Sequence, residues 1–429
     1  MDRFFGVFGI IAILGLAYLM SNNRKAINWR TIISGLIFQL CIALFVLKTP
    51  WGQFIFGQLG NGISHLLAFA NKGGDFVFGG LVNQPMLDKV FGPQNSFIFS
   101  LKLIPTIIFV AVLVNIAYHI GLMQKVVALV AKVVYKIMGV SGSEALSNAA
   151  SAFVGQVEAQ ILIKPYIAGM TKSELLASMT GSMACIAGGV MAVYISMGVP
   201  AQYLLAASVM AAPGALVIAK MVFPETQESE TKGEIKLEIK KTSANLLDAI
   251  AHGASEGMRI SINVIAMLIG LIALINMIDA ILGYAGTVSA NIGLSLGFIG
   301  IDLHHLSLSG ILGRVFSIAA WLMGVPWHDA STVGSLMGTK MVINEFVAYL
   351  NLVPIIKHTS TITLSAKSIV IASFALCGFA NFSSIAIQVG GIGELAPNRR
   401  ADLAKLGLKA LICGTMASYL SATLAGILF

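Results

Sequence analysis

The chain has 429 residues, of which 57% are hydrophobic and only 11% are charged. Soluble domains carry about 25% charged residues, so this composition, with a mean hydropathy of +0.87, excludes several soluble domains and indicates a protein that crosses a membrane repeatedly. The net charge of +8 is spread over short loops between apolar runs, which is typical of membrane topology and predicts no nucleic-acid partner.

Eight stretches are predicted to cross the membrane, because a spanning helix needs about 20 mainly apolar residues. They are Phe4–Met20, Thr31–Leu47, Phe97–Ile120, Glu174–Met197, Tyr203–Phe223, Ala254–Leu282, Lys367–Gly390 and Lys405–Leu428. The basic cluster Arg24, Lys25 and Arg30 follows the first stretch, and basic loops stay in the cytoplasm. We therefore predict an all-α polytopic membrane protein whose N-terminus is periplasmic.

Other segments between these spans are predicted to lie at the membrane surface or in water. Lys125–Met138 mixes lysines with valines, which favours a helix in the cytoplasmic interface, with an ordinary short span as the alternative. Phe54–Ala70 and Gly293–Met323 are apolar but interrupted by Gly, His and Ser, and we interpret them similarly. Pro224–Asn245 is rich in Glu and Lys, so it is predicted to be a soluble loop between two halves.

The sequences before and after this loop contain the same kinds of segment in the same order. Each has a span, an interfacial stretch, an apolar segment with several polar residues (a polar-studded segment) and two more spans. The polar-studded segments are Ser147–Met170 and Pro326–Pro354. An odd number of crossings separates them, so they enter the membrane from opposite sides. Such an inverted repeat is typical of secondary transporters, and each segment is interpreted as a re-entrant hairpin surrounded by protein or by a water-filled cavity.

Each predicted hairpin contains an acid, Glu158 in the first and Glu345 in the second. An unpaired carboxylate in the bilayer costs a few kcal/mol, so we expect both acids to be functional, the alternative being that they lie at loop ends in water. The spans after the hairpins are also unusual. Gly181–Gly189 is rich in small residues and Gly378–Ser384 carries an amide and two hydroxyls, and unwound helix there would expose backbone carbonyls to a cation.

Other classes of function fit the sequence less well. The four cysteines lack the paired spacing of a metal or redox site. The sequence shows no zincin motif, no nucleophile elbow and no convincing Ser/His/Asp set, so no enzyme and no cofactor are predicted. A passive channel would usually show symmetric filter loops or rings of charge, whereas two different hairpins with one acid each favour an occluded binding site.

Three strings carry a resemblance to a known family. Gly155-Gln156-Val157-Glu158, Asn344-Glu345-Phe346-Val347-Ala348-Tyr349 and Cys377-Gly378-Phe379-Ala380-Asn381-Phe382-Ser383-Ser384 resemble the concentrative nucleoside transporter family, and the likeness covers nearly the whole chain. The resemblance implies eight spans, two opposed re-entrant hairpins, interfacial helices, a homotrimer in membrane lipid, and cation-driven nucleoside import by an elevator-type mechanism. The minimal length of the chain suggests a bacterial inner membrane.

The resemblance also implies a division into domains. Residues 1–121 would form scaffold helices with an interfacial helix, and residues 246–290 a long scaffold span. Residues 122–223 would form the first half of the transport domain, and residues 291–429 the second half. The soluble loop would occupy residues 224–245.

Site residues follow from the resemblance position by position. Those assigned to the nucleobase are Gln156, Glu158, Val190 and Ile260. Those assigned to the ribose are Glu345, Asn381 and Ser384, with Phe379 lining the pocket. The chemistry suits a ribose, because a carboxylate can accept hydrogen bonds from two hydroxyls and an amide can both donate and accept.

The chain departs from the sodium-coupled pattern of the family. Val157 stands where those relatives carry a hydroxyl residue that contacts the base. Ser151 stands where they carry a sodium-binding asparagine, and Cys185 where they carry a serine, while Val154 and Ile186 would supply only backbone carbonyls. Because Na⁺ prefers hard oxygen ligands, the sodium site looks degraded.

We therefore predict proton coupling, with Glu158 or Glu345 as the proton carrier and with sodium coupling as the alternative. His304, His305 and His328 are rival proton sites. A nucleobase or another small polar metabolite is the alternative cargo.

Overall fold

The computed structural model describes residues 5–92, 98–231, 243–291 and 306–429, and the regular elements in these ranges are all helical. The first group is α1 (Phe5–Leu19), α2 (Trp29–Lys48), α3 (Pro50–Phe78), α4 (Gln84–Phe91), α5 (Phe99–His119) and α6 (Leu122–Met138). Next come α7 (Gly142–Ser151), α8 (Glu158–Ile161), α9 (Lys164–Ile167), α10 (Lys172–Ala184), α11 (Gly188–Met197) and α12 (Ala201–Val222). The last group is α13 (Leu246–Asn291), α14 (Leu308–Leu322), α15 (Trp327–Val342), α16 (Glu345–Ile356), α17 (Ala366–Leu376), α18 (Phe382–Leu395) and α19 (Arg400–Leu428). Short 3₁₀ turns cover Arg24–Ala26, Gly79–Val82 and Pro397–Arg399.

Polar side chains fix where several of these helices begin. Ser141 and Glu144 form a capping box at the start of α7, and Thr171 and Glu174 form another at the start of α10. Such boxes satisfy backbone N–H groups that have no partner inside the helix. Asn344 caps α16 in a similar way, by accepting a hydrogen bond from the backbone N–H of Val347. The polar residues that interrupt the apolar sequence therefore position the helix ends.

The helices occur in the same order in both halves of the described chain. In the first half α5 and α6 precede the short helices α7–α9, the interrupted pair α10–α11 and the long helix α12. In the second half α13 and α14 precede α15–α16, the interrupted pair α17–α18 and the long helix α19. This order matches the predicted repeat, and the opposed entry of the two hairpins into the membrane stays a prediction.

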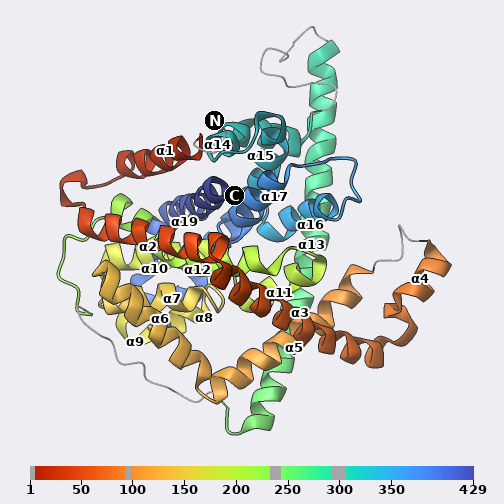
Figure 1. Ribbon diagram of the computed structural model, residues 1–429, viewed down its shortest axis with the longest axis horizontal. Helices are drawn as coiled ribbons and strands as arrows, with labels where there is room; N and C mark the ends of the chain where they lie inside the picture. The colour runs from red at the N-terminus through yellow and green to blue at the C-terminus, as the bar shows by residue number, and fades with distance from the viewer. Residues whose placement is uncertain (1–4, 93–97, 232–242, 292–305) are drawn as a thin grey trace.

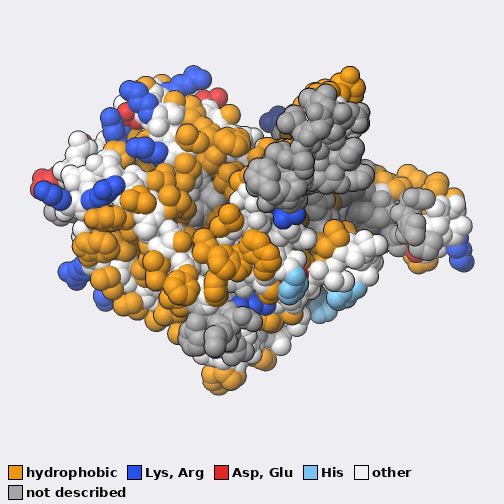
Figure 2. Space-filling model, turned by 90° about the horizontal axis from the view of Figure 1, so that it is seen from above, with side chains coloured by type: hydrophobic (Ala, Val, Ile, Leu, Met, Phe, Trp, Pro, Cys, Tyr) orange, Lys and Arg blue, Asp and Glu red, His pale blue; other side chains and the backbone are white. Residues whose placement is uncertain are grey.

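The surface of the molecule suits a lipid environment. The helix α13 runs along one side and packs against α5 (Figure 1). Only 6% of the most apolar part of α13 is buried within the chain, so this helix needs lipid or another protein surface around it. Figure 2 shows hydrophobic side chains over much of one face, with Lys and Arg side chains gathered toward its left end. The prediction of an all-α polytopic membrane protein is confirmed.

The structure supports the helical class of the protein more directly than it supports the predicted number of spans. Within the described residues, six helical stretches are long and apolar enough to cross a membrane, and the bent pair α14–α15 raises the number to seven. The predicted eight also counted Phe4–Met20, where α1 has only 15 residues, and Lys367–Gly390, which the structure divides into α17 and α18. Length and composition therefore leave the number eight as a prediction.

Several predicted interfacial or soluble segments have definite positions. Phe54–Ala70 lies inside the longer helix α3, and Lys125–Met138 lies in the amphipathic helix α6. The stretch Gly293–Met323 ends in helix α14, while its residues 293–305, with His304 and His305, lie outside the described residues. The part of the soluble loop at 232–242 also lies outside them.

The first residues of the predicted soluble loop contact the helices through a buried ionic cluster. The Lys220 ammonium on α12 pairs with the buried Glu144 carboxylate of α7, and its Nζ lies 3.5 Å from Glu225 Oε2 in the loop. The same nitrogen donates to Ser173 Oγ at 2.9 Å. Lys220 is only 7% exposed, so each of these partners compensates a charge that water does not reach.

The predicted spans Glu174–Met197 and Lys367–Gly390 are each interrupted near their middle. Helix α10 ends at Ala184 and α11 begins at Gly188, while α17 ends at Leu376 and α18 begins at Phe382. At the second interruption Gly378 has φ of +143°, and a Cβ there would lie 2.5 Å from Ala184 O. Only glycine fits such a backbone and such a close approach, so Gly378 allows the two interruptions to touch.

Two cysteines mark equivalent points of the interrupted helices. Cys185 and Cys377 are the C-cap residues of α10 and α17. The Cys185 thiol lies 3.9 Å from Ser208 O, and the Cys377 thiol lies 3.8 Å from Leu204 O. Both acceptors are carbonyl oxygens of α12, so this helix contacts the interruption of each half.

Candidate functional site

The interruptions of the two broken helices pack against each other at the centre of the molecule. The backbone N–H of Phe379 donates to Cys185 O at 3.2 Å. Ser418 Oγ on α19 lies 3.5 Å from Ala184 O and 3.4 Å from Cys377 O, so one hydroxyl contacts both helix ends. Backbone polar groups from both halves therefore gather in one place, where they satisfy one another.

Glu345 lies beside this centre as the first residue of α16 and is 5% exposed. Its Oε1 accepts a hydrogen bond from Tyr194 Oη at 3.1 Å, and its Oε2 accepts one from Asn381 Nδ2 at 3.2 Å. Both donors come from the broken helices, Tyr194 from α11 and Asn381 from the start of α18. The carboxylate is thus held at both oxygens, with unused lone pairs left on each.

Asn381 also organises the start of α18. Its Oδ1 accepts from the Ser384 backbone N–H at 2.9 Å and from Ser383 Oγ at 2.7 Å. Ser384 Oγ in turn donates to Phe379 O at 2.5 Å. The predicted ribose group of Glu345, Asn381, Ser384 and Phe379 is therefore assembled in one network, although the first of these residues comes from another helix.

Gln156, between α7 and α8, connects the first predicted hairpin to the same network. Its Nε2 lies 3.3 Å from Ser384 Oγ, and its Oε1 accepts from Gln388 Nε2 at 3.4 Å. Gln388 Nε2 also donates to Met179 O on α10 at 3.2 Å. The turn between α7 and α8 is thereby joined to α18, so that the two halves of the chain share one polar centre.

The other residues predicted to contact the base lie around this polar centre, and they make fewer polar contacts than Gln156 does. Glu158 begins α8 and is exposed. Val157 packs against Gly391, where a Cβ would lie 2.7 Å from Val157 Cγ2. Val190 on α11 and Ile260 on α13 are partly buried in the apolar cluster that also contains Phe379.

The residues predicted to form a degraded sodium site surround the turn that follows α7. Ser151 Oγ, at the end of α7, donates to Ser147 O at 2.8 Å and lies 3.1 Å from Ser182 Oγ. Cys185 and Ile186 are buried in the interruption after α10, and Val154 is buried in the turn between α7 and α8. The side chains of this group offer one hydroxyl oxygen and a soft thiol, so further oxygen ligands would have to come from backbone carbonyls.

Sequence reasoning missed three residues of this region. Tyr194 binds Glu345, Gln388 binds Gln156, and Lys340 donates from its buried ammonium to Ala375 O at 2.8 Å. Tyr194 and Gln388 are single polar groups in mainly apolar stretches, and Lys340 lies in the polar-studded segment Pro326–Pro354. A buried polar group needs a partner, so each of these side chains had to lie beside another polar group of the fold.

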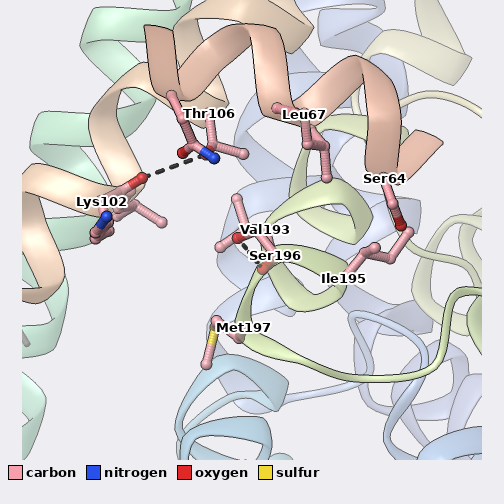
Figure 3. A pocket seen from close by; sticks show the side chains of 11 residues that line it. Ser64, Leu67, Lys102, Thr106, Val193, Ile195, Ser196 and Met197 are labelled. Atoms are coloured by element: carbon pink, nitrogen blue, oxygen red, sulfur yellow. Dashed lines mark hydrogen bonds between the residues drawn. The ribbon is translucent and has the colours of Figure 1, made fainter. Parts of the chain in front are cut away.

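A cavity of about 380 Å³ opens beside the polar centre without including it. Figure 3 shows its lining, which comes from α3, α5 and α11. The lining includes Ser64, Lys102, Thr106, Val193 and Ser196. Helix α11 separates the two regions, because it presents Val193 to the cavity and Tyr194 to Glu345.

Comparisons with known proteins agree with this architecture. Residues 203–426 match the C-terminal profile of the Na⁺ dependent nucleoside transporters, and residues 8–81 match the N-terminal profile. Residues 100–201 match a profile described as nucleoside recognition. Together the profiles cover both halves of the chain.

Relatives match the chain over nearly its whole length. It is 43% identical over 428 residues to the uncharacterized transporter YutK of Bacillus subtilis, with 100% of both chains covered. It is 36% identical over 423 residues to the nucleoside permease NupC of Helicobacter pylori, covering 99% of this chain and 97% of that one. It is 37% identical over 432 residues to the sodium/nucleoside cotransporter 1 of Rattus norvegicus, covering 98% of this chain and 63% of the rat protein.

Solved structures agree as well. The transporter CNTnw in an inward-facing substrate-bound state matches with a TM-score of 0.92 and 42% identity, covering 100% of this chain and 98% of that one. The fold and the matches define a polytopic membrane transporter and not an enzyme. The chain belongs to the concentrative nucleoside transporter family.

Proposed function

We propose that the protein imports nucleosides together with a cation, and that the cation is a proton. The observation that carries the proposal is the continuous set of hydrogen bonds from Gln388 through Gln156, Ser384 and Asn381 to Glu345. It joins the turn between α7 and α8 in one half to a broken helix of the other, among buried and partly buried side chains.

The two ends of this network suit the two ends of a nucleoside. Glu345 and Asn381 offer a buried carboxylate and an amide, which fit the hydroxyl pair of a ribose. Gln156 offers an amide that can donate and accept, as the edge of a nucleobase requires, and Phe379, Val190 and Ile260 offer apolar surface for its faces. Glu158 and Val157 complete the base side, where valine offers no hydrogen bond. The permease of Helicobacter pylori supports the same substrate class.

Proton coupling is supported by the groups around Ser151. In sodium-coupled relatives that position would supply an amide oxygen, whereas here a short hydroxyl bonds to Ser147 O and Ser182 Oγ. The thiol of Cys185 is a soft ligand that sodium disfavours. The proton would be carried by Glu158 or Glu345, the acids of the two hairpins.

Sodium coupling is the second candidate. It is favoured by the matching profiles of Na⁺ dependent transporters and by the sodium/nucleoside cotransporter of the rat. In that case backbone carbonyls near Val154 and Ile186, together with the Ser151 hydroxyl, would complete the ion site.

The proposed cycle is an elevator motion of residues 122–223 and 291–429 against a scaffold of residues 1–121 and 246–290. Matching structures of CNTnw variants in outward-facing and intermediate states, with TM-scores of 0.91 and 0.90, support alternating access. The assembly would be a homotrimer in lipid of a bacterial inner membrane, with a periplasmic N-terminus. The exposed apolar surface of α13 supports a partner surface there.

The test is uptake of labelled uridine by proteoliposomes that contain the full chain. An inward proton gradient without sodium should drive accumulation, and an inward sodium gradient at equal pH should not. Accumulation driven only by sodium would replace proton coupling by the second candidate. Competition by uracil equal to competition by uridine would instead reassign the cargo to nucleobases, because uracil lacks the ribose that Glu345 and Asn381 would bind.

A further inference from the structure

Helix α6 has one face inside the molecule and one face outside it. The inner face consists of Gln124, Val127, Ala131, Val134 and Met138, which are buried and recur at helical spacing. Through them the helix packs against α7, α2 and α5. This packing fixes how α6 is rotated about its own axis, so its other side chains are turned to the surroundings of the molecule.

Three lysines form a stripe along the outer face of α6. Lys125, Lys132 and Lys136 are all exposed, and at 3.6 residues per turn they lie within about 40° of one another around the helix axis. The helix contains no acidic residue. A stripe of positive charge therefore follows α6 for about three turns.

Large apolar side chains run beside the lysine stripe. Leu122, Leu129, Val133 and Ile137 are all exposed, and Leu129 is 65% exposed. They lie between the lysines and the buried face of the helix. A helix with this pattern lies in the plane of a membrane surface, with its apolar side chains among the acyl chains and its lysines at the level of the headgroups.

The start of α2 places α6 at a membrane surface by an independent route. The two helices are in close contact, because a Cβ on Gly35 of α2 would lie 2.5 Å from Met138 Cε. About 9 Å earlier along α2, at 1.5 Å per residue, Trp29 is exposed and stacks on Tyr18 with 6.5 Å between the ring centroids. The Arg24 guanidinium lies 5.3 Å from the Tyr18 ring centroid. Trp and Tyr beside basic residues are typical of the headgroup level.

We propose that α6 is a docking surface for the anionic phospholipids of the cytoplasmic leaflet. Lipid phosphates contact the lysine stripe, while Leu129 and its apolar neighbours enter the acyl chains. Charge complementarity selects this occupant, because that leaflet is negatively charged and attracts clusters of Lys and Arg. Helix α6 connects α5 to α7, so bound lipid holds this connection at the membrane surface. The inference does not depend on which substrate or cation the protein carries.

The experiment measures which lipid surrounds α6 in the full chain. Cys41 is exposed and the other three cysteines are buried, so Leu129→Cys in a Cys41→Ser background directs a fluorescent thiol label to position 129. The protein is placed in vesicles of equal parts phosphatidylglycerol and phosphatidylcholine, with bromine near the start of one acyl chain of either lipid. Bromine quenches the label at short range, so the ratio of the two quenching constants reports the local lipid composition.

We expect phosphatidylglycerol to quench the label at position 129 at least about fivefold more strongly than phosphatidylcholine, since one lysine near an anionic surface contributes about that factor. The same label on Cys41 of α2, in the unaltered chain, should give a ratio of about one. Raising the salt concentration to about 1 M should reduce the preference at position 129, because the Debye length falls to about 3 Å.

Matched pairs of substitutions test the lysines themselves. Lys125→Gln combined with Lys136→Gln should lower the ratio at position 129 by at least about half. Lys72→Gln combined with Lys89→Gln, at exposed lysines of α3 and α4, should leave it unchanged. A ratio of about one at position 129 in the chain with all its lysines, or a preference that the Lys125 and Lys136 pair of substitutions leaves intact, would overturn the proposal.

Discussion

The amide nitrogen of Gln156 lies 3.3 Å from the hydroxyl of Ser384, although 228 residues separate them in the chain. Gln156 belongs to the turn between α7 and α8, and Ser384 belongs to the start of the broken helix α17–α18 in the other half. A substrate bound between them would replace or extend this contact. The contact therefore marks the boundary between the proposed base and ribose sides of the site.

Gln156→Ala should weaken nucleoside binding by about 1–3 kcal/mol, because the polar edge of the bound nucleobase would lose its amide partner in a buried place. The loss should appear for uridine and be absent for ribose. Calorimetry on the purified chain checks this, with Gln53→Ala on α3, an exposed glutamine, as the control. An equal loss for uridine and ribose would contradict the assignment of Gln156 to the base.

Glu345→Gln should abolish uridine uptake while the protein is still expressed and folded. Glutamine keeps the size of the side chain but presents one acceptor oxygen in place of two, so the ribose hydroxyls and Tyr194 compete for it. Uptake by proteoliposomes measures the effect, and Glu394→Gln at an exposed acid of α18 is the control. Normal uptake by Glu345→Gln would remove the ribose assignment.

Ser151→Asn combined with Cys185→Ser should make uptake responsive to sodium, because the two changes supply an amide oxygen and a hydroxyl where the chain has a short hydroxyl and a thiol. The measurement is uridine uptake at equal pH with and without an inward sodium gradient. Cys413→Ser, at a buried cysteine of α19, controls for the general effect of removing a thiol. Sodium stimulation in the unaltered chain would show that the original site is already complete.

Gly378→Ala should impair folding or transport, because alanine disfavours φ of +143° and its Cβ would lie 2.5 Å from Ala184 O. Gly390→Ala on α18 is the matched control, since a Cβ there meets nothing within 4 Å. The readouts are the melting temperature in detergent and the uptake rate. Equal behaviour of the two variants would mean that the interruptions of α10 and α17 do not need to touch.

Lys220→Met should destabilise the protein by about 3–5 kcal/mol, because it leaves the buried Glu144 carboxylate without its cation. A lowered melting temperature measures the loss. Lys172→Met is the control, since Lys172 pairs with Asp402 at 3.5 Å while 55% of its side chain is exposed, and exposed pairs contribute about 0–1 kcal/mol. A melting temperature that stays the same in Lys220→Met would show that the loop is not fastened by this cluster.

Much of the fold followed from the sequence because hydrophobicity dictates which segments enter a membrane. The helical class, the order of parts in the two halves and the unusual character of Gly181–Gly189 and Gly378–Ser384 all came from apolar runs and their polar interruptions. The length of α3 did not, since its Gly and His residues indicated a broken segment. Those residues are tolerated within one helix because helix continuity depends on packing as well as on local preference.

The site was predictable in part for a different reason. Glu345, Asn381 and Ser384 were recognisable as polar groups in apolar surroundings, and the fold brings them together. Tyr194 and Gln388 were not recognised, because a single polar residue in a span gives no indication of its partner across the chain. Those contacts depend on how the two broken helices pack, which spacing within one segment does not specify.

The thiols of Cys185 and Cys377 rest on carbonyls of residues 208 and 204, which are four positions and thus about one turn apart on α12. One helix, α12, therefore contacts the interrupted helices of both halves of the transporter. The two interruptions cannot slide along it independently without breaking their contact through Phe379 N and Cys185 O. The interrupted helices should accordingly travel together as one body, and their relative position should be the same at both ends of the transport cycle.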